Sequence, residues 1–186
     1  MITSISEFQR RSEEDPSQSA TRKDCTKAVC GFANIILADQ PESKKLLYVG
    51  VAGDPVGGEY TPLFKPSFDT TTLDFDPKWK PDLVGDITKS EDFCERGKYG
   101  VLVCVQVIEH VRNMWDLPLS LQRAVCKGGY VIIDCPWMYP YHAEPPSFGD
   151  FWRISPDGMK ALFGNHFDLI QVVATKNNTS CLLRKQ

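Results

Sequence analysis

The sequence predicts an α/β fold in which a doubly wound sheet carries helices on its faces. Short apolar runs typical of buried strands alternate with helical patterns, which is the first observation behind this prediction. The second is that the first run ends in a glycine turn and later runs end in acidic or polar residues, where doubly wound sheets bind their ligands. With 186 residues, the chain is long enough for one such domain and its core.

The expected helices combine apolar residues at i, i+3 and i+4 with a capping residue. With their caps they are residues 22–39 (Thr21 or Asp24), Asp116 to Cys126 (Asp116) and Ser155 to Phe163 (Ser155). Pro41 would end the first helix, and Lys127-Gly128-Gly129 would end the second.

The expected strands are apolar, β-branched runs between turn residues. In chain order they are Leu46 to Val51, Thr70 to Asp74, Asp82 to Gly85, Tyr99 to Val107, Tyr130 to Cys135, Phe167 to Ala174 and Thr179 to Leu183. The fourth is nearly all apolar, as a central parallel strand buried on both faces must be. The last two should form an antiparallel hairpin that closes the sheet. The first connection, Gly53 to Pro66, should be short, with a helical turn at Tyr60 to Phe64.

Residues 1–21 form a polar segment that we expect to be mobile, and residues 22–186 form the domain. The segment has only a few apolar residues, which allow one short helix. It is therefore either a frayed terminus or a lid that folds over a ligand.

The composition favours a globular protein with a small-molecule partner. Apolar residues make up 42% of the chain, and no apolar run approaches the ~20 residues of a membrane span. The formal net charge of −3 gives no broad attraction to nucleic acid or to anionic lipid. No signal peptide is recognisable, so we expect a cytoplasmic protein without a membrane partner.

The seven cysteines show no Cys-x-x-Cys spacing. Cys104, Cys135 and Cys181 lie inside apolar runs, where cysteine packs as a small hydrophobe. We therefore expect reduced cysteines, an intracellular setting and no zinc site.

Segments that resemble known family motifs follow one another along roughly residues 45–175. They are Leu46 to Pro55, Thr72-Leu73-Asp74, Pro81 to Asp86, Val105 to Val111, Lys127-Gly128-Gly129 and Asp150 to Gly158. In this order they resemble class I S-adenosylmethionine-dependent methyltransferases, and more narrowly the small type 11 branch. The resemblance implies a Rossmann-like sheet of seven strands, all parallel except the last, with S-adenosylmethionine across the carboxyl ends.

The resemblance also implies roles for single residues. The glycine turn would meet the methionine part of the cofactor, an acid after the second strand would grip the ribose hydroxyls, and an acid with an apolar neighbour would hold the adenine. Two polar residues after the fourth strand would lie beside the sulfonium. In that order the residues are Gly50, Val51, Ala52 and Gly53, then Asp74, then Asp86 and Ile87, then Gln106 and Glu109.

Two positions depart from the family pattern. Tyr48 stands where an acid is usual, and Asp54 stands where a third glycine is common. Tyrosine cannot accept hydrogen bonds as a carboxylate does, so either cofactor affinity is reduced or another group holds the methionine amine. A methyltransferase-like binding or scaffold protein without turnover therefore stays an alternative.

Methyl transfer from a sulfonium is an in-line displacement that depends on positioning. A hydroxyl acceptor benefits from a general base, and His142 and His110 are the candidates. Tyr141 and Glu144 flank His142 closely enough to orient it, whereas His166 is expected at the surface near a helix end.

The segment Pro136 to Ile154 is a long loop rich in proline and aromatic residues, and loops of this length are usually functional. Tyr139, Tyr141, Trp152 and Arg153 are its candidates for binding an acceptor, because aromatic faces with polar rims suit a sugar ring or a flat metabolite. Alternatively, Trp152 and Phe151 plug the end of the sheet.

One motif in this region is misleading. Asp134-Cys135-Pro136-Trp137 is superficially similar to the Asp-Pro-Pro-Trp signature of adenine amino-methyltransferases. It lacks the second proline and follows the fifth strand instead of the fourth, so we do not expect nucleic-acid methylation.

The sequence thus predicts an S-adenosylmethionine-dependent methyltransferase with a small-molecule or glycan acceptor, methylated at oxygen. A nicotinamide-binding protein is a poorer alternative, because Gly50 to Pro55 breaks the Gly-x-Gly-x-x-Gly spacing. No metal site is predicted, although Asp134, His142 and Glu144 would offer ligands if the loop folded back.

Overall fold

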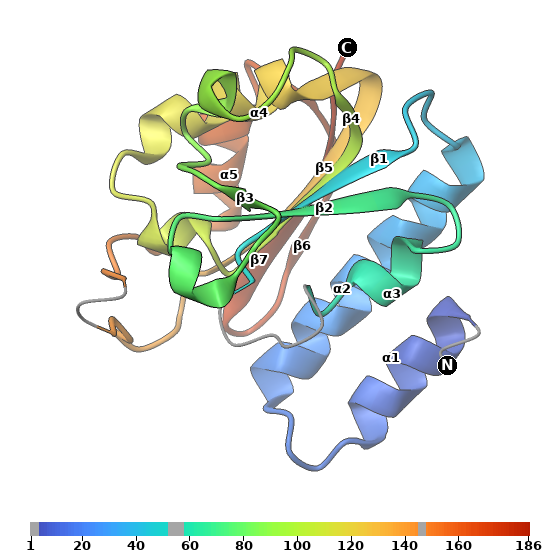
Figure 1. Ribbon diagram of the computed structural model, residues 1–186. Coiled ribbons are helices and arrows are strands. Elements are labelled where there is room, and N and C mark those ends of the chain that lie inside the picture. Colours follow the sequence, from blue (N-terminus) through green and yellow to red (C-terminus); the bar gives the residue numbers. More distant parts are fainter. Residues whose placement is uncertain (1–3, 52–57, 145–147) are drawn as a thin grey trace.

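The computed structural model describes residues 4–51, 58–144 and 148–186, and its central feature is one seven-stranded sheet (Figure 1). The strands are β1 (Lys45–Val49), β2 (Asp69–Asp74), β3 (Leu83–Val84), β4 (Tyr99–Val105), β5 (Val125–Pro136), β6 (Asp168–Ala174) and β7 (Asn178–Arg184). They are ordered β3-β2-β1-β4-β5-β7-β6. Only β7 runs antiparallel to its neighbours β5 and β6. The predicted doubly wound, mostly parallel sheet with a terminal antiparallel hairpin is confirmed.

The helices cover the two faces of the sheet in two groups (Figure 1). On one face lie α1 (Ile5–Glu14), α2 (Ala20–Asp39) and α3 (Thr61–Phe64), and on the other lie α4 (Leu117–Ala124) and α5 (Pro156–Phe163). The short 3₁₀ helices are η1 (Pro77–Trp79), η2 (Ser90–Asp92), η3 (Ile108–His110) and η4 (Met114–Asp116). Within the part of the chain that the structure describes, no helix is long and apolar enough to cross a bilayer.

Strand β4 lies at the centre of this arrangement. All seven of its residues are buried. Leu102 and Cys104 face the core under α4 and α5, and Val101, Val103 and Val105 face the core under α2. The alternation of side chains along a strand explains why β4 must be apolar on both faces, as the sequence predicted.

The polar N-terminal segment contains helix α1, the short helix that the sequence allowed. The hydroxyl of Ser4 caps it by accepting from the Glu7 N–H at 3.1 Å. Phe8 is buried, with its ring centroid 6.1 Å from that of Tyr60. This contact fixes α1 against the α2 side of the domain, and the expected mobility of residues 1–21 stays a prediction.

Several predicted element boundaries are wrong, for local reasons. Strands β1 and β4 each end two residues earlier than predicted, because Gly50 (φ 81°) and Gln106 (φ 56°) leave the extended conformation. Ser19 caps α2 in place of Thr21 or Asp24, so the helix begins at Ala20.

Two more differences flank helix α4. Asp116 occupies its N-cap position, but its carboxylate accepts from the Asn113 amide instead of from the helix backbone. The chain enters β5 directly at Val125, and Gly128 (φ 72°) lies within an irregular start of that strand instead of in a helix-ending turn.

All seven cysteines are free, and all except Cys126 are buried. Cys104, Cys135 and Cys181 pack in the core under α4 and α5, as expected of small hydrophobes. Burial raises the pKa of Cys181 to about 12, which makes this thiol unreactive.

Two glycines should respond to alanine with opposite signs. A Cβ on Gly100, in β4, would lie 1.9 Å from the Ser43 carbonyl oxygen, so Gly100→Ala should lower the free energy of unfolding by about 1 to 3 kcal/mol. Gly31, exposed on α2, has no atom within 4 Å of such a Cβ, so Gly31→Ala should raise it by about 0.5 to 1 kcal/mol. Urea unfolding of both variants measures this, and equal shifts would contradict the packing of β4 against the turn before β1.

Candidate active site

The candidate site begins where β1 and β4 end side by side. Gly50 follows β1 with φ 81° and donates its N–H to the Leu73 carbonyl at 2.9 Å. A Cβ on Gly50 would lie 2.4 Å from Cγ2 of Val107, so only glycine permits this close approach. The sheet order reverses between β1 and β4, and this switch point is the ordinary ligand position of doubly wound sheets.

The acid expected to grip a ribose is held by the backbone next to this turn. Asp74 is buried, and its Oδ2 accepts from the Val51 N–H at 2.9 Å while its Oδ1 accepts from the Asp76 N–H at 3.0 Å. A carboxylate has about four acceptor positions, so Asp74 retains capacity for two hydroxyls. Ala52, Gly53 and Asp54 lie outside the described residues.

The two residues predicted to meet adenine lie after β3. Asp86 is exposed, and its Oδ1 accepts from the N–H and the hydroxyl of Thr88 at 2.9 and 2.8 Å. Ile87 is buried in the core under α4 and α5. The structure therefore brings an acid and an apolar side chain to this edge, and their contact with adenine stays a prediction.

Tyr48, which stands where the family usually has an acid, does not point to the ligand-binding edge at the carboxyl ends of the strands. Its side chain is buried in the core on the α2 face. A Cβ on Gly58 would lie 2.7 Å from the Tyr48 ring, so the ring packs closely against the chain that follows the glycine turn. Tyr48 therefore has a packing role in this structure.

Gln106 and Asp134 join the ends of β4 and β5. The Gln106 amide donates to Asp134 Oδ1 at 2.5 Å, and the Gln106 N–H donates to the Asp134 carbonyl at 2.9 Å. Asn178 and Ser180 of β7 also donate to the same carboxylate. Burial raises the pKa of Asp134, and these donors stabilise its charge.

The Asp134 side chain thus connects β5 to the end of β4 and to β7. This corrects the suggestion from the sequence that Asp134 could be a metal ligand. Its carboxylate is occupied by Gln106 and β7 and does not gather with His142 and Glu144 as a set of metal ligands. The segment that is superficially similar to the adenine methyltransferase signature has a structural role here.

The long loop after β5 is organised by Arg153. A guanidinium carries five N–H donors. They bond to the carbonyls of Tyr139, Trp152 and Pro140 at 2.8, 2.7 and 2.7 Å, and to Oδ1 and Oδ2 of Asp150 at 2.5 and 2.7 Å. Arg153 was predicted to bind an acceptor, but its donors are engaged within the loop, so the structure gives it a positioning role.

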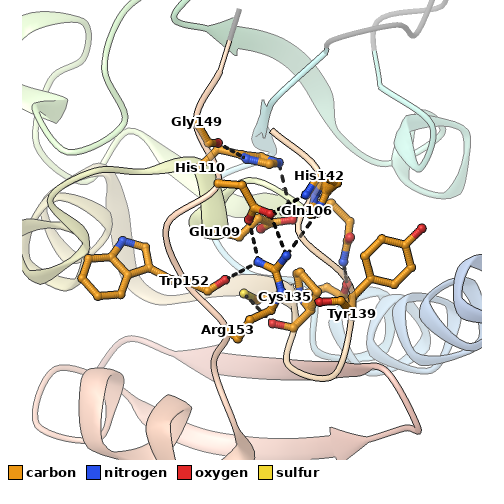
Figure 2. A network of polar contacts seen from close by, with 12 residues as sticks. Gln106, Glu109, His110, Cys135, Tyr139, His142, Gly149, Trp152 and Arg153 are labelled. Carbon is orange, nitrogen blue, oxygen red and sulfur yellow. Dashed lines mark hydrogen bonds and ion pairs between the residues drawn. The ribbon is translucent and has the colours of Figure 1, made fainter. Parts of the chain in front are cut away.

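The two predicted bases, His110 and His142, lie next to each other (Figure 2). Their ring centroids are 5.0 Å apart. Nδ1 of His110 lies 2.6 Å from the Gly149 carbonyl, so this nitrogen carries the proton and Nε2 carries the lone pair of the neutral ring. The His142 N–H donates to Asp150 Oδ2 at 2.7 Å, and its ring Nδ1 lies 3.2 Å from the same oxygen.

Glu109 is a fully buried acid of the candidate site. It is 0% exposed, and neither of its carboxylate oxygens has a hydrogen-bond partner among the described residues. Oε1 lies 3.8 Å from Nε2 of His110. Burial raises the pKa of Glu109 to about 8, and burial also lowers the pKa of His110 below its usual range.

The aromatic residues of the loop divide into two groups. Tyr139 and Tyr141 are 44% and 76% exposed and can meet a ligand. Trp152 packs against the core, and its indole N–H donates to the Val111 carbonyl at 2.8 Å. The position of Trp152 therefore agrees with the alternative in which it plugs the end of the sheet. Phe151 is 39% exposed and does not fill this role.

Sequence reasoning gave no role to Asp150. Its side chain holds Arg153 and the His142 backbone, while the Glu109 carbonyl accepts from the Phe151 N–H at 2.7 Å and fixes the loop to η3. The local signals were an acid three residues before an arginine and its place in the segment Asp150 to Gly158. Because this spacing is common outside helices too, only the folded loop identifies the pair.

Asp150 should make the loop sensitive to acid. Arg153 donates to its carboxylate and lowers the pKa of Asp150 from 3.8 to about 2. Since the folded-state pKa is the lower one, the stabilisation is complete above about pH 4 and is lost as the pH falls toward about 2. The difference in free energy of unfolding between the wild type and Asp150→Asn, about 1 to 2 kcal/mol at neutral pH, should shrink across this window. Denaturant unfolding at several pH values measures it, and a constant difference would contradict the assignment.

Comparison with known proteins agrees with this geometry. No protein-family model and no curated protein sequence matches the chain. Solved structures are similar at 10–11% identity, with TM-scores of 0.64, 0.59 and 0.57. The first is a candidate sarcosine dimethylglycine methyltransferase from Galdieria sulphuraria, and the match covers 88% of this chain and 88% of that chain. The second is a SAM-dependent methyltransferase from Archaeoglobus fulgidus, with 86% of this chain and 94% of that chain covered. The third is 1,6-didemethyltoxoflavin-N1-methyltransferase from Burkholderia thailandensis, with 98% of this chain and 87% of that chain covered. The chain thus has the Rossmann-like fold of class I S-adenosylmethionine-dependent methyltransferases.

Proposed function

We propose that this protein is an S-adenosylmethionine-dependent methyltransferase that methylates an oxygen of a small-molecule or glycan acceptor. One observation carries the proposal. In a class I methyltransferase fold, the glycine turn with Asp74 and the cluster of Glu109, His110 and His142 lie at the carboxyl ends of neighbouring strands. A donor site and an acceptor site at one sheet edge are what a transfer reaction requires.

The cofactor would lie across β2, β1 and β4. The Gly50 turn would take the methionine part, Asp74 the ribose hydroxyls, and Asp86 with Ile87 the adenine. Gln106 and Glu109 would lie beside the sulfonium. The similar enzyme from Burkholderia thailandensis was solved with 1,6-didemethyltoxoflavin and S-adenosylhomocysteine bound, which supports this use of the fold.

The acceptor would approach from the loop that Arg153 organises. Tyr139 and Tyr141 expose aromatic faces that suit a sugar ring or a flat metabolite. As the methyl carbon moves from sulfur to the acceptor oxygen, the hydroxyl proton must leave. His110 is suited to accept it, because its hydrogen bond to Gly149 leaves Nε2 with the lone pair. His142, 5.0 Å away between ring centroids, is the second candidate.

The formal charge of −3 favours a small acceptor over nucleic acid. The expected cytoplasmic location is part of this proposal. A methyltransferase-like binding protein without turnover is the outcome if cofactor binds and no acceptor is ever methylated.

Asp74 gives the sharpest test of the cofactor site. Isothermal titration with S-adenosylmethionine and S-adenosylhomocysteine should show binding that Asp74→Asn weakens roughly 10- to 100-fold, because a charged acceptor of the ribose hydroxyls is lost. Asp69→Asn is the matched control, since Asp69 is exposed at the opposite end of the same strand and should bind as the wild type does. NADH should not bind.

A folded wild-type protein that binds neither sulfur cofactor would overturn the proposed function. Equal weakening in the two aspartate variants would instead remove Asp74 from the ribose site. Circular dichroism of each variant shows whether the protein is folded.

A further inference from the structure

We propose that Glu109, His110 and His142 bind one divalent transition-metal ion. Among the described residues, these three side chains are the group whose ligand atoms converge, and the atoms lie within 4.8 Å of one another. Figure 2 shows that they come from two places in the fold, the η3 turn and the loop after β5. One carboxylate and two imidazoles are a common ligand set for such ions.

The first argument is the state of Glu109. Its carboxylate is fully buried, and no described residue donates a hydrogen bond to it. The guanidinium of Arg153 cannot serve, because Asp150 and three carbonyls take its donors. A buried carboxylate without donors is costly, whereas a bound cation both neutralises it and occupies its oxygens.

The second argument is the orientation of His110 and His142. Protein ligands to metals usually present one ring nitrogen to the ion and donate from the other to a carbonyl or carboxylate. Nδ1 of His110 is held by the Gly149 carbonyl at 2.6 Å, and Nε2 is directed toward Glu109. Among the described residues, the polar contacts of the His142 ring all involve Nδ1, which lies 3.2 Å from Asp150 Oδ2, 3.2 Å from the Pro140 carbonyl and 3.3 Å from a guanidinium nitrogen of Arg153. Among the described residues, both rings therefore meet their outer partners through Nδ1 and leave Nε2 to face an ion.

The distances fit an ion after a small adjustment. Nitrogen and oxygen ligands of a tetrahedral zinc ion lie at about 2.1 Å from it and therefore about 3.4 Å from one another. His110 Nε2 and Glu109 Oε1 are already 3.8 Å apart. Binding would draw the three side chains inward by about 1 Å, which rotation about side-chain bonds allows.

The ligand types select among ions. Mg²⁺ and Ca²⁺ favour oxygen ligands, so two imidazoles disfavour both. Zn²⁺, Co²⁺ and Mn²⁺ accept imidazole and carboxylate together. Three protein ligands leave at least one coordination position for another molecule.

The open position gives the ion a role, and this step rests on the proposed function. A hydroxyl of the acceptor bound to the ion releases its proton to water more readily than a free hydroxyl. The oxygen then forms a bond to the methyl carbon while the carbon–sulfur bond breaks, and its electron pair stays on sulfur. In this role the imidazoles are ligands instead of proton acceptors.

The test is metal binding by the full chain, purified without a histidine tag and freed of metal by a chelator. Titration with Co²⁺, followed by visible absorption, and with Zn²⁺, followed by calorimetry, should each show one site per chain. Glu109→Gln and His142→Ala should weaken binding more than roughly 100-fold, and Asp150→Asn, which removes an outer partner of His142, roughly 10- to 100-fold. His166→Ala is the matched control, because His166 is the third histidine of the chain and lies outside the cluster.

Absence of a site in a folded wild type, or equal loss in His166→Ala, would overturn this inference. Titration of the same metal-free sample with S-adenosylmethionine separates it from the proposed function. Cofactor binding without metal binding would reject the ion alone. Metal binding without cofactor binding would support the ion and reject methyl transfer.

Discussion

The burial of strand β4 on both faces is the constraint on which the rest of the structure depends. Its seven residues are all buried between two layers of helices, so the strand cannot slide without exposing apolar side chains to water. This fixes where β4 ends, at Val105, beside the ends of β1 and β5. The turn that follows is short and carries Gln106, Glu109 and His110. Their positions are therefore set by the core and not by the loop itself.

The second half of the site is held differently. His142 belongs to a long loop whose described residues form no helix or strand, and ordering each of them costs conformational entropy. Asp150 and Arg153 offset this loss by satisfying loop carbonyls from a pair of opposite charges with little access to water. Two backbone hydrogen bonds to the Glu109 carbonyl then attach the loop to η3. The loop after β5 and the η3 turn are thus joined where His110 meets His142.

The buried carboxylate of Glu109 opposes folding. Its charge is unfavourable where it lies, and the nearest positive group is committed to Asp150. Asp134 is equally buried but accepts from Gln106, Asn178 and Ser180, so it is an ordinary structural carboxylate. This contrast between two buried acids at the ends of neighbouring strands supports the proposal that Glu109 binds an ion.

The sequence by itself determined the elements, their alternation and the edge at which the site lies, because burial on one or both faces of an element leaves a periodic apolar pattern. It also indicated Gly50, Asp74, His110 and His142 as residues of that edge. Only the tertiary structure decided that Arg153 and Trp152 serve the loop and its core contacts and that Tyr48 packs under α2. It also decided that the Glu109 carboxylate has no hydrogen-bond partner among the described residues. Hydrogen-bond partners such as Asp134 and Ser180 are 46 residues apart, and no local pattern in the chain records contacts made across the sheet.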